Sequence, residues 1–180
     1  MDTERNSIIR AKKDLQEFDY LYRKYYPIMN NFVFHRLNDE AVRNEIVSNV
    51  FFKAMKRLAL FRFLDSRKCS FSSWLYRIAV NEINQFYRNV KREDRIRESV
   101  KWNTVDGDDI QFNYKVIQRK IAVFKTYEQN LITLRFFEKL SYREIADIYN
   151  KKEGAIKVQM HRLLKKLRCD VEKEIENERS

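Results

Sequence analysis

The stretch "LSYREIADIYNKKEGAIKVQMHRLLKKL", Leu140–Leu167, holds two short apolar periodicities on either side of a polar, lysine-bearing break. Ser141-Tyr-Arg-Glu144 fits a capping box, in which the serine oxygen accepts a backbone N–H and the glutamate reaches back to the cap. A helix is therefore predicted to begin here. Asn150 is predicted to end it, because asparagine is one of the few residues other than glycine that tolerates a left-handed turn.

The second periodicity predicts a further helix with opposite apolar and basic faces. Its apolar positions recur at steps of four, three and four: Ile156, Met160, Leu163 and Leu167. Two helices joined by so short a turn are typical of the helix-turn-helix, whose second helix enters the DNA major groove. An amphipathic hairpin with a lysine-rich solvent face is the alternative. The basic excess of residues 151–168, where Glu153 is the only acid, favours DNA binding.

The composition favours an all-α chain with a polyanionic partner. One proline and two glycines are too few for the turns that a sheet with hairpins needs. Apolar residues, at 44% of 180, are enough for packed cores. The formal charge of +11 indicates nucleic acid first and an anionic membrane surface second.

The residue types that carry chemistry exclude several classes of protein. Cys69 and Cys169 lie far apart without zinc or redox spacing, so we expect ordinary thiols in a reducing compartment, and neither metal nor cofactor. No apolar run has the length of a signal peptide or a membrane span, so a soluble cytoplasmic protein is expected. No catalytic Ser/His/Asp or Cys/His arrangement is found, and glycines are too few for a nucleotide loop. An enzyme is therefore not expected.

Apolar periodicity divides the chain into two small helical domains. The helical pattern is strong before residue 93, although Pro27 is predicted to interrupt the first helix. It fails between residues 93 and 109, in a polar stretch that ends in acidic side chains, and then returns. We predict an N-terminal domain at residues 1–95, a flexible linker at 96–111 and a C-terminal domain at 112–180. The acidic linker residues are Asp106, Asp108 and Asp109.

The C-terminal segment "LRFFEKLSYREIADIYNKKEGAIKVQMHRLLKKLR" resembles region 4 of extracytoplasmic-function (ECF) sigma factors, the small promoter-recognition subunits of bacterial RNA polymerase. Lys139 and Asn150 stand where the family usually has glycine. Ala155-Ile156 replaces its common Thr-Val pair, and Val158-Gln159 its common Ser-Arg pair. Fold-determining positions are retained while base-reading positions differ, so the resemblance implies no particular promoter sequence.

Three upstream segments resemble region 2 of the same family. They are "SFSSWLYRIAVNEINQFYRNVKR" at 70–92, "EIVSNVFFKAMKRL" at 45–58 and "FDYLYRKYYP" at 18–27. The resemblance implies a sigma factor that binds polymerase core and directs promoter-specific initiation. The alternative is a helix-turn-helix regulator that acts without polymerase, although a ligand or dimerisation domain would not need the segment at 74–81. A metal-dependent nuclease would need clustered carboxylates, which are scattered here.

The resemblance also implies roles for individual residues. Capture of unstacked bases needs aromatic faces, polar pockets and a cationic track, and the segment at 70–92 supplies all three. Asn81 stands where the family holds a flipped base of the −10 non-template strand, whereas Trp74 is either a core residue or a stacking platform. The candidates for the −10 region are Trp74, Arg77, Asn81, Arg88, Lys91 and Arg92.

The remaining candidates are assigned to the −35 duplex and to polymerase. Base readers would be Lys157, Gln159, His161 and Arg162, and phosphate contacts would be Arg143, Lys151 and Lys152. Polymerase would be met by Glu45, Ser48, Asn49 and Lys53, with Ile46, Val50 and Phe51 in the core.

The expected partners are RNA polymerase core and promoter DNA. Family members are commonly held inactive by anti-sigma proteins, often membrane-bound, so an anti-sigma factor is a further candidate partner. The acidic linker either mimics nucleic acid in a polymerase channel or keeps a loop soluble. No insertion into a membrane is expected, and the free chain is expected to be a monomer.

Overall fold

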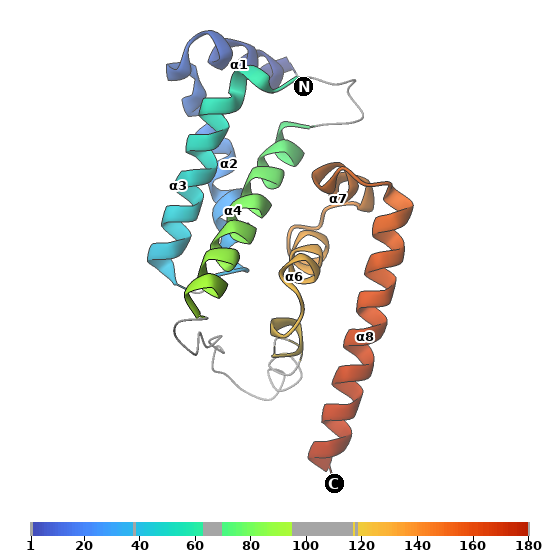
Figure 1. The fold of residues 1–180 in the computed structure, drawn as a ribbon. Helices are drawn as coiled ribbons and strands as arrows, with labels where there is room; N and C mark the ends of the chain where they lie inside the picture. The colour runs from blue at the N-terminus through green and yellow to red at the C-terminus, as the bar shows by residue number, and fades with distance from the viewer. Residues whose placement is uncertain (1, 38, 63–69, 95–116, 118, 180) are drawn as a thin grey trace.

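Helices account for the regular structure of this computed structural model (Figure 1). The structure describes residues 2–37, 39–62, 70–94, 117 and 119–179, and within these ranges it contains no strand. The all-α prediction is therefore confirmed. The elements are α1 (Asp2–Lys13), η1 (Leu15–Phe18), α2 (Asp19–Phe34), α3 (Glu40–Arg57), η2 (Leu58–Leu60), α4 (Phe71–Asp94), α6 (Thr126–Ile132), the π-helical η3 (Thr133–Phe137), α7 (Tyr142–Tyr149) and α8 (Glu153–Arg179).

The N-terminal helices form a bundle in which α3 packs against both α2 and α4. Side-chain caps start two of these helices: Asp39 Oδ1 accepts the N–H of Val42 at 3.0 Å, and Ser70 Oγ accepts the N–H of Ser73 at 3.0 Å. The apolar stripes of the sequence face inward, with Leu21, Phe32, Val50, Leu75 and Ile83 all buried. These stripes determine which side of each helix points away from the bundle. On α4, part of that side packs against the C-terminal helices.

Pro27 does not interrupt α2, contrary to the prediction from sequence. The helix runs from Asp19 to Phe34 with Pro27 inside it. An internal proline removes one backbone hydrogen bond and costs about 3 kcal/mol. Tyr25 and Met29 are buried on either side, and each large buried side chain contributes roughly 1.5–3 kcal/mol. Burial of both halves on the same core therefore outweighs the proline, whose ring is exposed.

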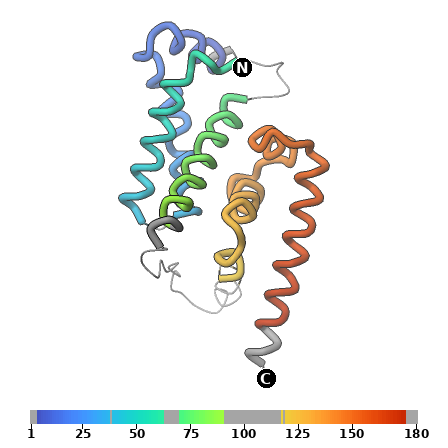
Figure 2. Tube along the Cα trace, in the orientation of Figure 1, coloured from blue at the N-terminus to red at the C-terminus, as the bar shows by residue number. Residues whose placement is uncertain are grey.

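The predicted helix-turn-helix is formed by α7 and α8. Glu144 N donates to Ser141 Oγ at 3.2 Å and Ser141 N donates to Glu144 Oε2 at 2.8 Å, so the capping box is confirmed. Asn150 ends α7 in the left-handed region, with φ of 52°. Beyond the turn, α8 has 27 residues and is about 40 Å long at 1.5 Å per residue (Figure 2).

Lys139 is a second residue in the left-handed region, with φ of 56°. It follows η3 and precedes the cap of α7, at a position where the resembling family usually has glycine. Leu140 N donates to Leu134 O at 3.0 Å across this turn. The backbone thus makes the turn that glycine would favour, although the side chain is lysine.

The two groups of helices pack directly on one another. α4 contacts α6 and α7, and η3 contacts α2. Figure 1 shows α4 between α3 and the C-terminal helices. We call this arrangement the docked form. The predicted linker at 96–111 and both predicted domain boundaries lie outside the described residues.

Candidate nucleic-acid interface

Four of the −10 candidates share one face of α4. At about 100° per residue, Trp74, Arg77, Asn81 and Arg88 fall within an arc of about 60°, along roughly 21 Å of helix. Asn81 and Arg88 are exposed, whereas Trp74 and Arg77 are half-buried. We call these four residues the α4 stripe. Lys91 and Arg92 belong to the same helix, but their side chains lie outside the described part.

Trp74 lies at the boundary between core and surface. Its ring centroid is 5.2 Å from that of Phe61 and 5.4 Å from that of Phe71, both buried residues. Half-burial leaves part of the indole accessible. The two roles considered from sequence are therefore compatible, because one part of the ring packs while another can meet a base.

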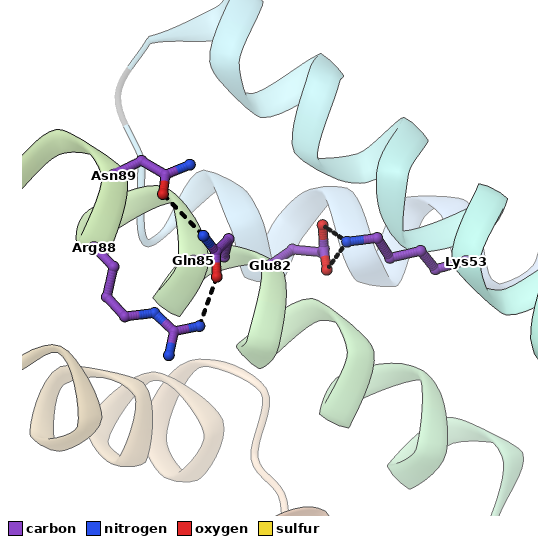
Figure 3. Close-up of polar contacts among 5 residues, drawn as sticks. All are labelled: Lys53, Glu82, Gln85, Arg88 and Asn89. Atoms are coloured by element: carbon purple, nitrogen blue, oxygen red, sulfur yellow. Dashed lines mark hydrogen bonds and ion pairs between the residues drawn. The ribbon is translucent and has the colours of Figure 1, made fainter. Parts of the chain in front are cut away.

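Side-chain contacts along α4 hold Arg88 of the α4 stripe and the polymerase candidate Lys53 in place (Figure 3). Lys53 Nζ on α3 donates to both carboxylate oxygens of Glu82, at 2.6 and 2.7 Å. An Arg88 guanidinium nitrogen donates to Gln85 Oε1 at 2.7 Å, and Gln85 Nε2 donates to Asn89 Oδ1 at 2.8 Å. Lys53, assigned to polymerase from sequence, thus also ties α3 to α4.

The polymerase candidates lie on one side of α3, and the structure adds Phe52 to them. Glu45 and Ser48 are exposed, and Asn49 and Lys53 are half-buried. Phe52 falls within the arc that these four positions cover and is 60% exposed. Apolar periodicity does not indicate it because, of the adjacent Phe51 and Phe52, only Phe51 fits the apolar stripe of the helix. The expected core residues Ile46, Val50 and Phe51 are buried.

The −35 candidates do not share a single face of α8. His161 and Arg162 are exposed on the side opposite the buried residues, while Lys157 lies toward one edge and pairs with Glu153 at 2.7 Å. Gln159 lies toward the other edge and is half-buried against α6. Lys151, Lys152 and Arg143 are exposed around the turn and on α7.

Tyr127 on α6 joins two of these candidates, and no local pattern in the sequence indicates this role. Its hydroxyl accepts a hydrogen bond from Lys151 Nζ at 3.1 Å and donates one to Gln159 Oε1. An ammonium group can only donate, so the phenol proton is left for the amide oxygen. Lys151 Nζ also lies 4.6 Å from the Tyr127 ring centroid. The Gln159 side chain therefore points toward α6.

Arg77 of the α4 stripe bonds to the helix-turn-helix. Its Nε donates to Ile148 O at 2.9 Å, and its terminal nitrogen donates to Asp147 O. A guanidinium at a helix C-terminus meets the carbonyl groups of the last turn and the negative end of the helix dipole. Nearby, Glu138 accepts from Tyr76 Oη at 2.6 Å and from Asn31 Nδ2 at 2.8 Å. A candidate DNA-binding residue is therefore used inside the docked form.

Arg36 is buried in the same interface, with 2% of its surface exposed. Its Nε donates to Asn130 Oδ1 at 2.7 Å, and its guanidinium lies 5.6 Å from the Tyr87 ring centroid. Burial lowers the pKa of Arg36, because it disfavours the charged form. Asn130 Nδ2 also donates to Asn84 Oδ1 at 3.2 Å. Polar contacts of this kind are typical of interfaces that separate, rather than of permanent cores.

Three further features of the described residues concern metal, membrane and thiol chemistry. Over these residues no three His, Cys, Asp or Glu side chains gather where they could hold a metal ion. No helix in the described part is long and apolar enough to cross a membrane. Cys169 is a free, exposed thiol, and Cys69 lies outside the described residues.

Two family models match the two groups of helices in order. Sigma-70 region 2 matches residues 21–93, which hold α3 and nearly all of α2 and α4, and sigma-70 region 4 matches residues 122–168, which hold α6, α7 and the first part of α8. The chain belongs to the sigma-70 family. Within it, this chain is an ECF sigma factor that directs promoter-specific transcription. That membership favours a polymerase subunit over a helix-turn-helix regulator acting alone.

Individual relatives agree with this sigma-factor assignment. The chain is 29% identical to the RNA polymerase sigma factor YlaC of Bacillus subtilis over 175 residues, covering 93% of this chain and 99% of that one. It is 24% identical to the ECF RNA polymerase sigma factor BldN of Streptomyces coelicolor over 161 residues, covering 83% and 58%.

A solved structure shares the fold of this sigma factor. The sigma factor RpoE from Bartonella quintana, solved with the anti-sigma factor NepR, has a TM-score of 0.66. The sequence identity is 18%, over 87% of this chain and 98% of that one.

Proposed function

We propose that the two groups of helices divide promoter recognition between them. The α4 stripe captures unstacked bases of the −10 region, and α7 with α8 reads the −35 duplex. The observation that carries this is the α4 stripe itself, which sets an aromatic ring, an amide and two guanidinium groups along one helix face. The −10 set comprises Trp74, Arg77, Asn81, Arg88, Lys91 and Arg92; the −35 set comprises Arg143, Lys151, Lys152, Lys157, Gln159, His161 and Arg162.

Each member of the α4 stripe has chemistry suited to a melted strand. The exposed Asn81 amide both donates and accepts, so it can pair with the edge of an extruded base. The accessible part of Trp74 can stack on a base, and Arg77 and Arg88 can follow the phosphates. Arrangement along one face allows successive nucleotides to meet successive side chains.

The docked form must open before both promoter elements can be bound at once. Positions −10 and −35 are about 25 base pairs apart, which is about 85 Å at 3.4 Å per base pair. The longest described helix, α8, spans only about 40 Å, and Arg77 of the −10 surface bonds directly to α7 of the −35 reader. We therefore propose that the docked form is the resting state, and that polymerase and promoter separate its halves.

The chemistry of transcription is assigned to the polymerase core, and the chain itself is not an enzyme. Core polymerase would meet α3 through Glu45, Ser48, Asn49 and Lys53, to which Phe52 is now added. An anti-sigma factor is a candidate partner, because the structurally similar RpoE was solved with one. We place the protein in the cytoplasm, with its polymerase, as a monomer when free.

Transcription in vitro tests the proposal. Bacterial core polymerase is supplied with the chain and a genomic promoter library, and initiation sites are sequenced. Specific initiation is expected only when the chain is present, and Asn44→Ala, at an exposed asparagine of α3, should leave it unchanged. Tight binding of duplex DNA by the chain alone, with no specific initiation, would overturn the proposal in favour of a regulator.

A further inference from the structure

Helix α8 presents an exposed apolar residue on its outward face. Val158 is 50% exposed and lies opposite the buried residues Ile156, Met160 and Leu163. At about 100° per residue, Lys165 lies about 20° from it, two turns further along the helix. The four positions one turn away flank it within about 60° on either side: Gly154, Ala155, His161 and Arg162. All four are exposed. The part of α8 that faces a groove is therefore built around a valine.

The surroundings of Val158 suit a close approach by DNA. Ala155 has a small side chain, and the space around Gly154 is open, with nothing within 4 Å of where a Cβ would stand. His161, Arg162 and Lys165 are exposed nearby and supply donors and positive charge. A lone exposed valine needs no explanation on an ordinary surface. Here it lies on a face that also carries the cationic side chains of Arg162 and Lys165.

Gln159, the neighbouring amide, is turned away from this centre. Tyr127 donates to Gln159 Oε1 and holds the side chain toward α6. Gln159 therefore lies at the edge of the helix, whereas Val158 lies in the middle. Among residues 153–174, whose side chains the structure describes, Val158 is the only large apolar residue that is exposed.

We propose that Val158 determines specificity by contacting the methyl group of a thymine in the −35 element, and this rests on the proposed binding of α8 to the −35 duplex. The C5-methyl of thymine is the apolar group that the major groove presents. A valine can neither donate nor accept a hydrogen bond. Contact with a methyl group is therefore favourable, whereas contact with a polar base edge removes water from that edge without replacing its hydrogen bonds. Tyr127 acts as a positioning residue, because it keeps the polar amide of Gln159 out of that contact.

Replacement of thymine by deoxyuridine tests this contact, since it removes only the methyl group. Holoenzyme made with the full chain is bound to a promoter from the library, and each −35 thymine on either strand is replaced in turn. One replacement should weaken binding about fourfold, the effect of one buried methyl-sized group. The ratio of the affinity for the thymine promoter to the affinity for the deoxyuridine promoter measures the contact. Val158→Ala should reduce that ratio, and Val158→Ser should bring it near one. Val123→Ala, at a valine that is 78% exposed outside α8, should keep the full ratio.

Each other outcome overturns the inference in a recognisable way. If the −35 element matters but holds no thymine, or no replacement changes affinity, the Val158 contact is wrong and the proposed function stands. If Val158→Ala weakens binding to the thymine and deoxyuridine promoters equally, and the melting temperature of the protein is unchanged, Val158 does not contact the methyl group. If a scrambled −35 element binds as well as the original, the proposed function itself fails.

Discussion

Substitution of Tyr76 by phenylalanine should open the docked form. Tyr76 Oη donates to Glu138 Oε2 at 2.6 Å, and this bond joins α4 to the segment between η3 and α7. Burial, aided by Glu138, raises the pKa of Tyr76, so the phenol remains a donor and the carboxylate the acceptor. The ring itself packs edge-on to Phe32 at 5.4 Å, a contact that phenylalanine keeps.

The size of the effect follows from the type of bond. A hydrogen bond to a charged group contributes roughly 1.5–3 kcal/mol. Glu138 keeps the bond from Asn31 Nδ2, so the loss should lie near the lower end, at about 1.5 kcal/mol. Every 1.4 kcal/mol is a factor of ten, so the ratio of open to docked molecules should rise about tenfold.

Single-molecule energy transfer measures that ratio directly in the free chain. One dye is attached to Cys169 on α8 and the other to Ala41→Cys on α3, in a chain that carries Cys69→Ser. Tyr20→Phe, which removes an exposed hydroxyl on α2, serves as the matched control and should leave the ratio unchanged. A change of less than about twofold for Tyr76→Phe would refute the reasoning from hydrogen-bond energies.

Three further outcomes are expected. Asn81→Ala should impair promoter opening, followed with permanganate, while −35 binding is retained; equal loss of both would indicate misfolding instead. Lys152→Ala should weaken binding to all promoters and reduce the slope of log affinity against log salt by about one. An unchanged slope would rule out its phosphate contact. Burial lowers the pKa of His35 below its ordinary 6.5, although Glu138 opposes the shift. Because the docked form disfavours the protonated ring, docking should be strongest above pH 6.5 and weaken as the pH falls through it, and His35→Phe should remove that component of the energy-transfer ratio.

Local signals in the sequence were sufficient to predict much of the helix-turn-helix formed by α7 and α8. The capping box at Ser141 and the left-handed turn at Asn150 depend on neighbouring residues, and both are present in the structure. The apolar steps that define the buried side of α8 are likewise local, which is why Ile156 and Met160 lie where predicted. What can be decided within one helical turn was predictable.

Features that depend on distant parts of the chain were not predictable. Arg36 and Asn130 are 94 residues apart in sequence, and no local pattern shows that a basic residue in the turn after α2 will be buried by α6. Tyr127 and Gln159, 32 residues apart, are a second example. Pro27 was misjudged because its cost is local whereas the burial that outweighs it comes from the whole bundle.

With the −10 role that we propose for Arg77, its bonds to α7 place the protein's own helices in competition with DNA. Its guanidinium can hold the carbonyl groups of α7 or contact a promoter strand, but the same nitrogens cannot do both. By thermodynamic reciprocity, a partner that favours separation of the halves raises affinity for the −10 strand by the same factor by which that strand favours the partner. Removal of Arg77 would delete both its bonds to α7, which hold the docked form, and its contact with DNA. The two losses have opposite effects on DNA affinity, so the loss of affinity in such a variant would underestimate what the arginine contributes to DNA binding.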